Sequence, residues 1–272
     1  MCGIAGAWTK DPGEGLRAVE RMCQAMTARG PDGEGVVLLP IAGGAVALGN
    51  RHLAVIDPSP AGHQPMADPE RGTVIVFNGF IANFVELRRR LEAEGERFAS
   101  RCDTEVVLRA YGRYGPACIG MLRGMFALAV WDPRAEALFL ARDPFGVKPL
   151  YYYHRGDRLL FASQVRALLV SGLVSRTLSN EGLATFLAFG AVREPLTAIA
   201  GVYALPPGHT ATVRRGRLEP VRYWQAPQPA LAPPTLTPAD PPPPAPLPQA
   251  GEGCPTGGVR AAGPPLSAPS TG

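Results

Sequence analysis

The aromatic residues of this chain end at Trp224, and that boundary limits what the chain can fold into more than any other feature. All 20 aromatic side chains (10 Phe, 7 Tyr and 3 Trp) and 47 of the 50 charged ones lie in the first 225 residues. The other 47 residues, 226–272, hold 15 of the 30 prolines and only three charges. A segment without large apolar side chains cannot offset the entropy lost on ordering. We therefore predict one folded domain over residues 2–225 and a disordered Pro/Gly/Ala-rich tail over 226–272.

Composition argues against several classes of protein. A net charge of +4 with scattered Lys and Arg does not favour nucleic-acid binding. No apolar run approaches the roughly 18 residues that span a membrane, and the start does not read as a signal peptide. The five cysteines are an odd number without a CxxC pair, so neither a disulfide framework nor a metal site is expected. We expect a cytoplasmic protein.

Hydrophobic periodicity predicts mostly strands, with a few helices between them. The expected strands are Ile4–Trp8, Val46–Ile56, Thr73–Phe77, Met125–Trp131, Ala137–Ala141, Leu150–His154, Leu159–Ala162 and a β segment over Gly208–Trp224. The expected helices run from a cap at Asn83 to Gly95, from Asp103 to Tyr114, and over Ser163–Leu169 and Ser179–Ala188. Because short turns link the strands and the helices stand apart from them, we predict an α+β fold with antiparallel sheets.

Cys2 is the most informative single residue for function. A small side chain at this position permits removal of Met1, which would leave a cysteine with a free α-amine. An amine with a pKa near ~8 is partly neutral at pH 7 and can serve as the base for the adjacent thiol. Nucleophile and base would then belong to one residue. Taken alone, a cysteine at position 2 is more often incidental than catalytic, so a catalytic role requires support from other motifs of the chain.

Five motifs occur along the chain in the order seen in a known family. They are Cys2-Gly3-Ile4-Ala5-Gly6, Arg29-Gly30-Pro31-Asp32-Gly33, Asn78-Gly79, the run Ser100–Glu105 and the run Ala141–Tyr152. With Phe161-Ala162-Ser163 and Leu205–His209, they make the chain resemble the N-terminal glutaminase domain of glutamine-dependent asparagine synthetases. These enzymes are class II, Ntn-type amidotransferases, and the resemblance runs from Cys2 to about Trp224. Sugar-phosphate and phosphoribosyl amidotransferases are a lesser alternative, which the Lys148–Tyr152 run disfavours.

The resemblance implies a fold, a reaction and a set of roles. The fold would be a four-layer αββα sandwich of two antiparallel sheets. The reaction would be hydrolysis of L-glutamine to glutamate and ammonia, through a γ-glutamyl thioester on Cys2. Asn78 and Gly79 would bind the oxyanion, and Asp103 would bind the substrate α-ammonium group.

Each of these residues also has a purely structural explanation. Without the family, Asn78-Gly79 is typical of a tight turn after a strand, and Asp103 is typical of a helix N-cap. Arg29 and Asp32 lie in a Gly/Pro-rich loop, where a salt-bridged or Asx turn explains them at least as well as substrate contact.

Three positions depart from the family pattern. His52 stands where the family usually has an Arg that clamps the substrate carboxylate. Arg51 is one residue away, and on a strand it would point to the opposite face unless a bulge intervenes. Phe80 replaces a Glu that shares the substrate ammonium group, and Gln164 replaces a Glu to which we assign no role. Arg51 and His52 are therefore the candidate carboxylate ligands, and we expect weakened glutamine affinity.

The resemblance covers only one half of such an enzyme. In the family, ammonia passes to an ATP-dependent synthetase domain that makes asparagine from aspartate, and nothing after Trp224 resembles that domain. ATP and Mg²⁺ would belong there, so we expect no cofactor in this chain. A separate synthetase chain or a second copy are the partners to consider. The alternative function is a non-catalytic binding module, or a truncated gene remnant with an impaired glutamine pocket.

Overall fold

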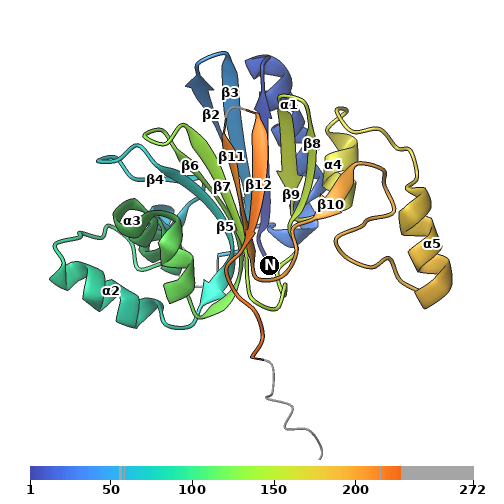
Figure 1. Cartoon of the computed structure of the whole chain (residues 1–272). Helices are drawn as coiled ribbons and strands as arrows, with labels where there is room; N and C mark the ends of the chain where they lie inside the picture. The colour runs from blue at the N-terminus through green and yellow to red at the C-terminus, as the bar shows by residue number, and fades with distance from the viewer. Residues whose placement is uncertain (55–56, 58, 215, 228–272) are drawn as a thin grey trace, which may run out of the picture. The chain divides into compact units, whose positions relative to one another are not determined.

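Strands dominate the structure, as the hydrophobic pattern predicts (Figure 1). In this computed structural model, which describes residues 1–54, 57, 59–214 and 216–227, they form two sheets of six strands each. Sheet A has the order β10 (Val202–Ala204), β8 (Tyr151–Arg155), β9 (Arg158–Ala162), β1 (Gly3–Thr9), β3 (Gly44–His52) and β2 (Gly33–Ile41). Sheet B has the order β12 (Arg217–Arg222), β11 (His209–Arg214), β7 (Ala137–Arg142), β6 (Gly124–Asp132), β5 (Val74–Ile81) and β4 (Met66–Ala67). Neighbouring strands in both sheets run antiparallel, which confirms the predicted pairing.

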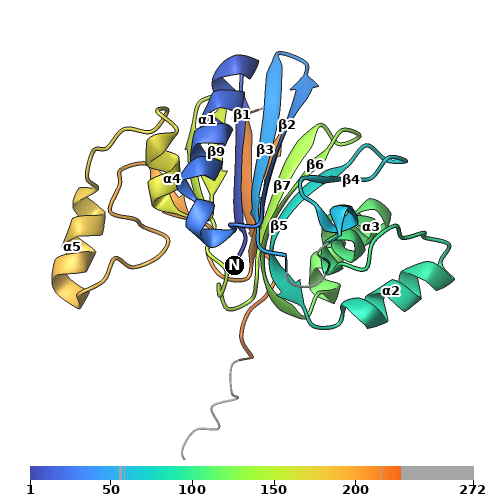
Figure 2. The same cartoon turned by 180° about the vertical axis from the view of Figure 1, so that it is seen from behind.

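Helices cover the outer faces of both sheets (Figures 1 and 2). The longer helices are α1 (Pro12–Ala25), α2 (Phe84–Ala93), α3 (Asp103–Tyr114), α4 (Val165–Val170) and α5 (Asn180–Phe189). Short 3₁₀ turns are η1 (Thr27–Arg29), η2 (Pro60–Gly62) and η3 (Gly115–Met121). Side chains of α1 and α4 pack on sheet A, and those of α2 and α3 pack on sheet B. The four-layer sandwich implied by the resemblance is therefore confirmed.

The two-residue alternation of the strands separates the core into layers. Ile4 of β1 and Leu48 of β3 point between the two sheets. Their neighbours Ala5 and Ala47 point the other way, toward α1. Alanine on that face lets α1 lie close to the strands, so the first strand of the chain is enclosed on both sides.

Two elements of this core, α1 and β2, were not among the predicted ones. Asp11 caps α1, since its carboxylate accepts hydrogen bonds from the backbone N–H groups of Gly13 (2.8 Å) and Glu14 (3.1 Å). Pro12 occupies the first turn, where its missing N–H costs nothing. An N-cap followed directly by Pro is the signal that identifies this helix start.

Asn83 is the N-cap residue of α2, as predicted, but its side chain makes no capping hydrogen bond, and the N-cap explanation of Asp103 is wrong. The Asn83 amide donates to the carbonyl oxygen of Met121 (3.0 Å) and accepts from the N–H of Arg123 (2.9 Å), so it ties α2 to the segment before β6. At α3 the N-cap is Cys102, and Asp103 is the first helical residue. Its carboxylate accepts from the N–H of Ile81 across the layer (3.0 Å), which joins α3 to β5.

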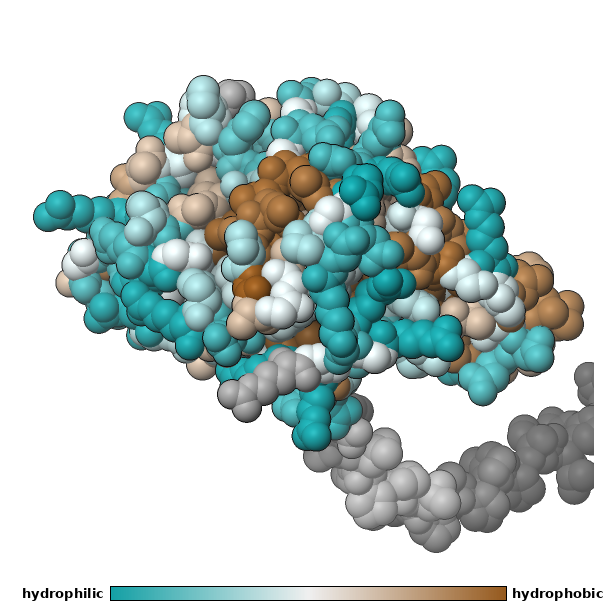
Figure 3. Space-filling view, turned by 90° about the horizontal axis from the view of Figure 1, so that it is seen from above, coloured by the Kyte–Doolittle hydropathy of each residue, from teal (hydrophilic) through white to brown (hydrophobic). Residues whose placement is uncertain are grey.

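The compact unit runs from Met1 to Pro227, and the remainder of the predicted tail lies outside the described residues. Seen from above, this unit has a hydrophobic patch near the middle of a largely hydrophilic face (Figure 3). Within the described ranges, no helix is both long and apolar enough to cross a membrane.

Candidate active site

Cys2 lies directly before β1, a central strand of sheet A, at the end of the sandwich where the chain begins (Figure 1). Its sulfur accepts a hydrogen bond from the backbone N–H of Leu53 (3.4 Å), and the thiol lies 3.9 Å from the Leu53 carbonyl oxygen. On the other side, Arg29 Nε donates to the Cys2 carbonyl oxygen (3.0 Å). The cysteine is thus fixed through both its backbone and its sulfur, while its side chain stays partly exposed.

Asn78 adjoins this cysteine from sheet B. Its side-chain amide lies between the Cys2 carbonyl oxygen and Arg29 Nη2. We assign the amide nitrogen to the carbonyl oxygen (3.1 Å) and the amide oxygen to Arg29 (3.3 Å), because only this orientation satisfies both groups. A Cβ on the next residue, Gly79, would lie 2.5 Å from the Met125 carbonyl oxygen, so only glycine fits there. Both residues are part of β5, and the tight-turn interpretation of this dipeptide is therefore wrong.

Asp103 lies at the start of α3, against the same strand. The side chain is buried, and burial raises the pKa of this carboxyl, while the hydrogen bond from the Ile81 N–H acts in the opposite direction. The positive end of the α3 dipole favours the charged form as well. An acidic group in a poorly hydrated position is suited to hold an ammonium group.

Arg51 and His52 point to opposite faces of β3. The register with β1 is regular and pairs Gly3 with Arg51, so no bulge intervenes. Arg51 is on the α1 face, where its guanidinium donates to the Gly30 carbonyl oxygen (3.0 Å) and forms an ion pair with Glu34. His52 is on the face that looks between the sheets. Of the two candidate carboxylate ligands, Arg51 is therefore already bound to other groups of the protein.

The imidazole of His52 is half-buried and lies near a second histidine. The ring centroids of His52 and His63 are 5.8 Å apart, and Nδ1 of His52 is buried without a hydrogen-bond partner among the described residues. Burial and the neighbouring His63 lower the pKa of His52, and Asp32 offsets part of that shift. The ring is therefore mostly neutral at pH 7.

The loop before β2 holds the site in place by contacts that the sequence does not reveal. Asp32 accepts from the N–H of Ala54 (2.9 Å), and its own N–H donates to the His52 carbonyl oxygen (3.1 Å). Arg29 contacts Cys2 as described. Both residues therefore contact backbone next to the predicted site, rather than closing the local turn expected from sequence.

Other predicted positions differ in their surroundings. Phe80 is 40% exposed and lies opposite Met125 in the β5–β6 register, and Gln164 is the N-cap residue of α4. The thiols of Cys23, Cys102 and Cys118 are buried and free, and burial raises the pKa of Cys23 and of Cys118 to about 12. In the part of the chain that the structure describes, no group of three or more His, Cys, Asp or Glu side chains could hold a metal ion.

Known proteins are similar to this chain in sequence. The family model for the glutamine amidotransferase domain matches residues 1–224. Asparagine synthetase (glutamine-hydrolyzing) 3 of Bacillus subtilis is 36% identical over 230 residues, which are 82% of this chain and 36% of that protein. Amidase chry2 of Gibberella zeae is 31% identical over 241 residues, 82% of this chain and 34% of that protein. The chain thus spans about a third of the length of these relatives.

A solved structure shares the fold. The glutamine phosphoribosylpyrophosphate amidotransferase of Bacillus subtilis, in complex with ADP and GMP, superposes with a TM-score of 0.62 at 18% identity. The match covers 82% of this chain and 49% of that one. At this level of identity the likeness concerns the arrangement of layers and strands alone.

Two stacked antiparallel sheets form the fold that this chain shares with that amidotransferase. The chain belongs to the glutamine amidotransferase domain family, because the family model covers residues 1–224. The predicted resemblance to asparagine synthetases is confirmed by relatives that are 36% and 37% identical.

Proposed function

We propose that this chain hydrolyses the side-chain amide of L-glutamine once Met1 has been removed. The observation that carries the proposal is the placement of Cys2, whose sulfur is held at the Leu53 N–H with Asn78 and Arg29 at its backbone. The α-amine of Cys2 would take the thiol proton as the sulfur attacks the amide carbon. The C–N bond then breaks, the leaving nitrogen takes that proton, and ammonia departs. Water cleaves the remaining thioester to give glutamate and the free thiol.

Asn78 and Gly79 supply the donors for the developing oxyanion in this scheme. An amide N–H and a backbone N–H on a strand that is paired along its length with β6 are preorganised, so they need no rearrangement as charge develops. Asp103 would hold the α-ammonium group of glutamine, and His52 would face its carboxylate. Arg51 stays a predicted ligand, but it would first have to leave Glu34 and Gly30.

Use of the ammonia belongs to a second activity. We propose that it serves an ATP-dependent synthetase, as the names of the relatives indicate, in a domain or chain beyond the residues described. ATP and Mg²⁺ would bind there, and the amidotransferase domain itself would need no cofactor. The exposed Phe80 and the neutral His52 favour the second candidate, a non-catalytic binding module.

Glutamine turnover separates the two candidates. The chain is purified, loss of Met1 is verified by intact mass, and glutamate and ammonia are measured after incubation with glutamine. We expect both products in equal amounts. No turnover, together with no covalent adduct at saturating γ-electrophilic glutamine analogue, would instead identify a binding module.

Glutamine binding should strengthen as the pH falls. The lowered pKa of His52 leaves the ring neutral at about pH 7.5, and protonation at lower pH adds a positive charge facing the substrate carboxylate. We expect the KM for glutamine to be constant from about pH 7.5 down to about pH 6.5, the ordinary pKa of histidine, because the pKa of His52 lies below that value. At lower pH the KM should fall by about tenfold as the ring is protonated, until Asp103, whose pKa is raised, also takes up a proton. His52→Arg keeps its charge throughout, so its KM should be low and nearly independent of pH.

The control for this experiment is His154→Gln. His154 is on β8, outside the site, and its ring contacts the Gly216 carbonyl oxygen (2.9 Å). The pH profile of KM should therefore be unchanged in this variant. If the pH profile of KM were the same in His52→Arg as in the parent chain, His52 would not face the substrate carboxylate.

A further inference from the structure

A buried amide, Gln64, joins the three elements that carry the site. Gln64 is 4% exposed and lies in the loop between η2 and β4. Its side-chain oxygen accepts from the Phe77 N–H of β5 (2.6 Å) and from Asn50 Nδ2 of β3 (3.2 Å). Its side-chain nitrogen donates to Thr104 Oγ1 of α3 (3.2 Å). One side chain thus bonds to both sheets and to a helix.

Each partner of Gln64 is next to, or two residues from, a proposed substrate contact. Phe77 precedes Asn78, Thr104 follows Asp103, and Asn50 is two residues before His52. Since neighbouring residues in a strand or helix move together, the amide fixes the spacing of these groups. Apart from the Ile81–Asp103 hydrogen bond, it is the side-chain link that connects β5 to the start of α3 in the described structure.

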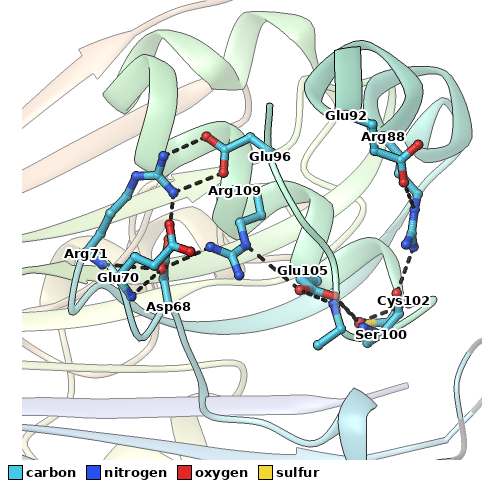
Figure 4. Close-up of polar contacts among 11 residues, drawn as sticks. Asp68, Glu70, Arg71, Arg88, Glu92, Glu96, Ser100, Cys102, Glu105 and Arg109 are labelled. Atoms are coloured by element: carbon cyan, nitrogen blue, oxygen red, sulfur yellow. Dashed lines mark hydrogen bonds and ion pairs between the residues drawn. The ribbon is translucent and has the colours of Figure 1, made fainter. Parts of the chain in front are cut away.

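Gln64 begins a clamp segment, residues 64–71, whose other end is tied to the body of α3 (Figure 4). There Asp68 forms an ion pair with Arg109 (3.1 Å), and Arg71 pairs with Glu96 (2.6 Å) and with Asp68 (3.0 Å). The sheet makes room for the segment, because a Cβ at Gly35 would lie 2.1 Å from the Gln64 carbonyl oxygen. The clamp segment therefore has one end at the site and one end remote from it.

We propose that Gln64 is a positioning residue for glutamine hydrolysis, which sets the spacing between Asp103 on α3 and Asn78 on β5. This inference rests on the proposed function. The ion pairs at the far end of the clamp segment then stabilise the fold and have no effect on glutamine hydrolysis. The two ends of one segment can then be compared directly.

The test pairs Gln64→Met with Arg71→Met, two changes to the same apolar residue that both remove polar contacts with buried groups. Both variants should lower Tm. Gln64→Met should lower kcat/KM for glutamine about tenfold, mostly through KM, because the substrate ammonium group loses its fixed ligand. Arg71→Met should keep kcat/KM within about twofold of the parent chain.

Thr104 gives a second, independent measurement, which also serves if Gln64→Met does not fold. Thr104→Val removes the same link and should raise KM similarly, whereas Thr104→Ser keeps the hydroxyl and should restore the parent value. The double variant should be no worse than Gln64→Met alone, since Gln64→Met already removes the contact with Thr104.

Two results would overturn the inference while leaving glutamine hydrolysis intact. One is an equal loss of kcat/KM in Arg71→Met and Gln64→Met at equal loss of Tm. The other is an unchanged KM in both Gln64→Met and Thr104→Val. A parent chain without any turnover would overturn the proposed function and this inference together.

Discussion

Replacing Cys2 by Ala should reduce glutamine hydrolysis to less than about one thousandth of the parent rate, because no other group can form the thioester. The structure places this sulfur 3.4 Å from the Leu53 N–H, at the one end of β1 that the chain terminus reaches. Ammonia release measures the rate, and intact mass after treatment with a γ-electrophilic glutamine analogue measures the adduct. Both signals should disappear in Cys2→Ala.

Two comparisons show whether the loss is specific. Cys118→Ala removes a fully buried thiol from the core under sheet B, so it should lower stability but keep the adduct. An additional residue inserted between Met1 and Cys2 keeps the thiol but removes the free amine, and it should also abolish turnover. Hydrolysis that survives in Cys2→Ala would contradict the proposed nucleophile.

Asn78→Ala is expected to lower kcat by about 10²–10³-fold with a much smaller change in KM. The side chain lies on β5, next to the edge strand of sheet B, and one N–H of its amide is directed at the Cys2 carbonyl oxygen. In the proposed scheme the second N–H of this amide donates to the oxyanion, an interaction that strengthens in the transition state. Steady-state rates at several glutamine concentrations separate the two effects.

Asn83→Ala is the matched control for this variant. Asn83, between β5 and α2, likewise has a side-chain amide with two hydrogen bonds, but these go to Met121 and Arg123, outside the site. Its kcat should stay close to that of the parent chain. If Asn78→Ala changed KM and left kcat unaltered, the residue would be a substrate ligand instead of an oxyanion donor.

Much of the fold could be predicted from the sequence because the strands of sheet B are short, strongly apolar and separated by turns. β6 and β7 are the clearest cases, and both lie within a residue or two of the predicted ranges. α1 escaped prediction because its buried face consists partly of Gly15 and Ala18, which give little periodic signal. β2 is an edge strand of intermediate burial, so its pattern does not alternate cleanly.

The site could be predicted only in part, for a different reason. Cys2, Asn78 and Asp103 are predicted through motifs of the family, because each would carry its chemistry in its own side chain. Gln64 and Arg29 act through contacts with residues distant in sequence, and these contacts exist only once the two sheets have stacked. The sequence does not show which of Arg51 and His52 is the better candidate ligand for the substrate carboxylate. The regular register of β3 with β1 places them on opposite faces of the strand.

The burial of the other thiols gives the protein a practical property. Among the described cysteines, only Cys2 is partly exposed, while Cys23, Cys102 and Cys118 are enclosed in the core. Once Cys254, which lies outside the described residues, is replaced by Ser, a brief exposure to a fluorogenic maleimide should label one position per molecule. The dye uptake then counts the molecules with an intact Cys2 thiol, and together with the fraction that has lost Met1 it allows turnover numbers to be referred to working sites rather than to total protein.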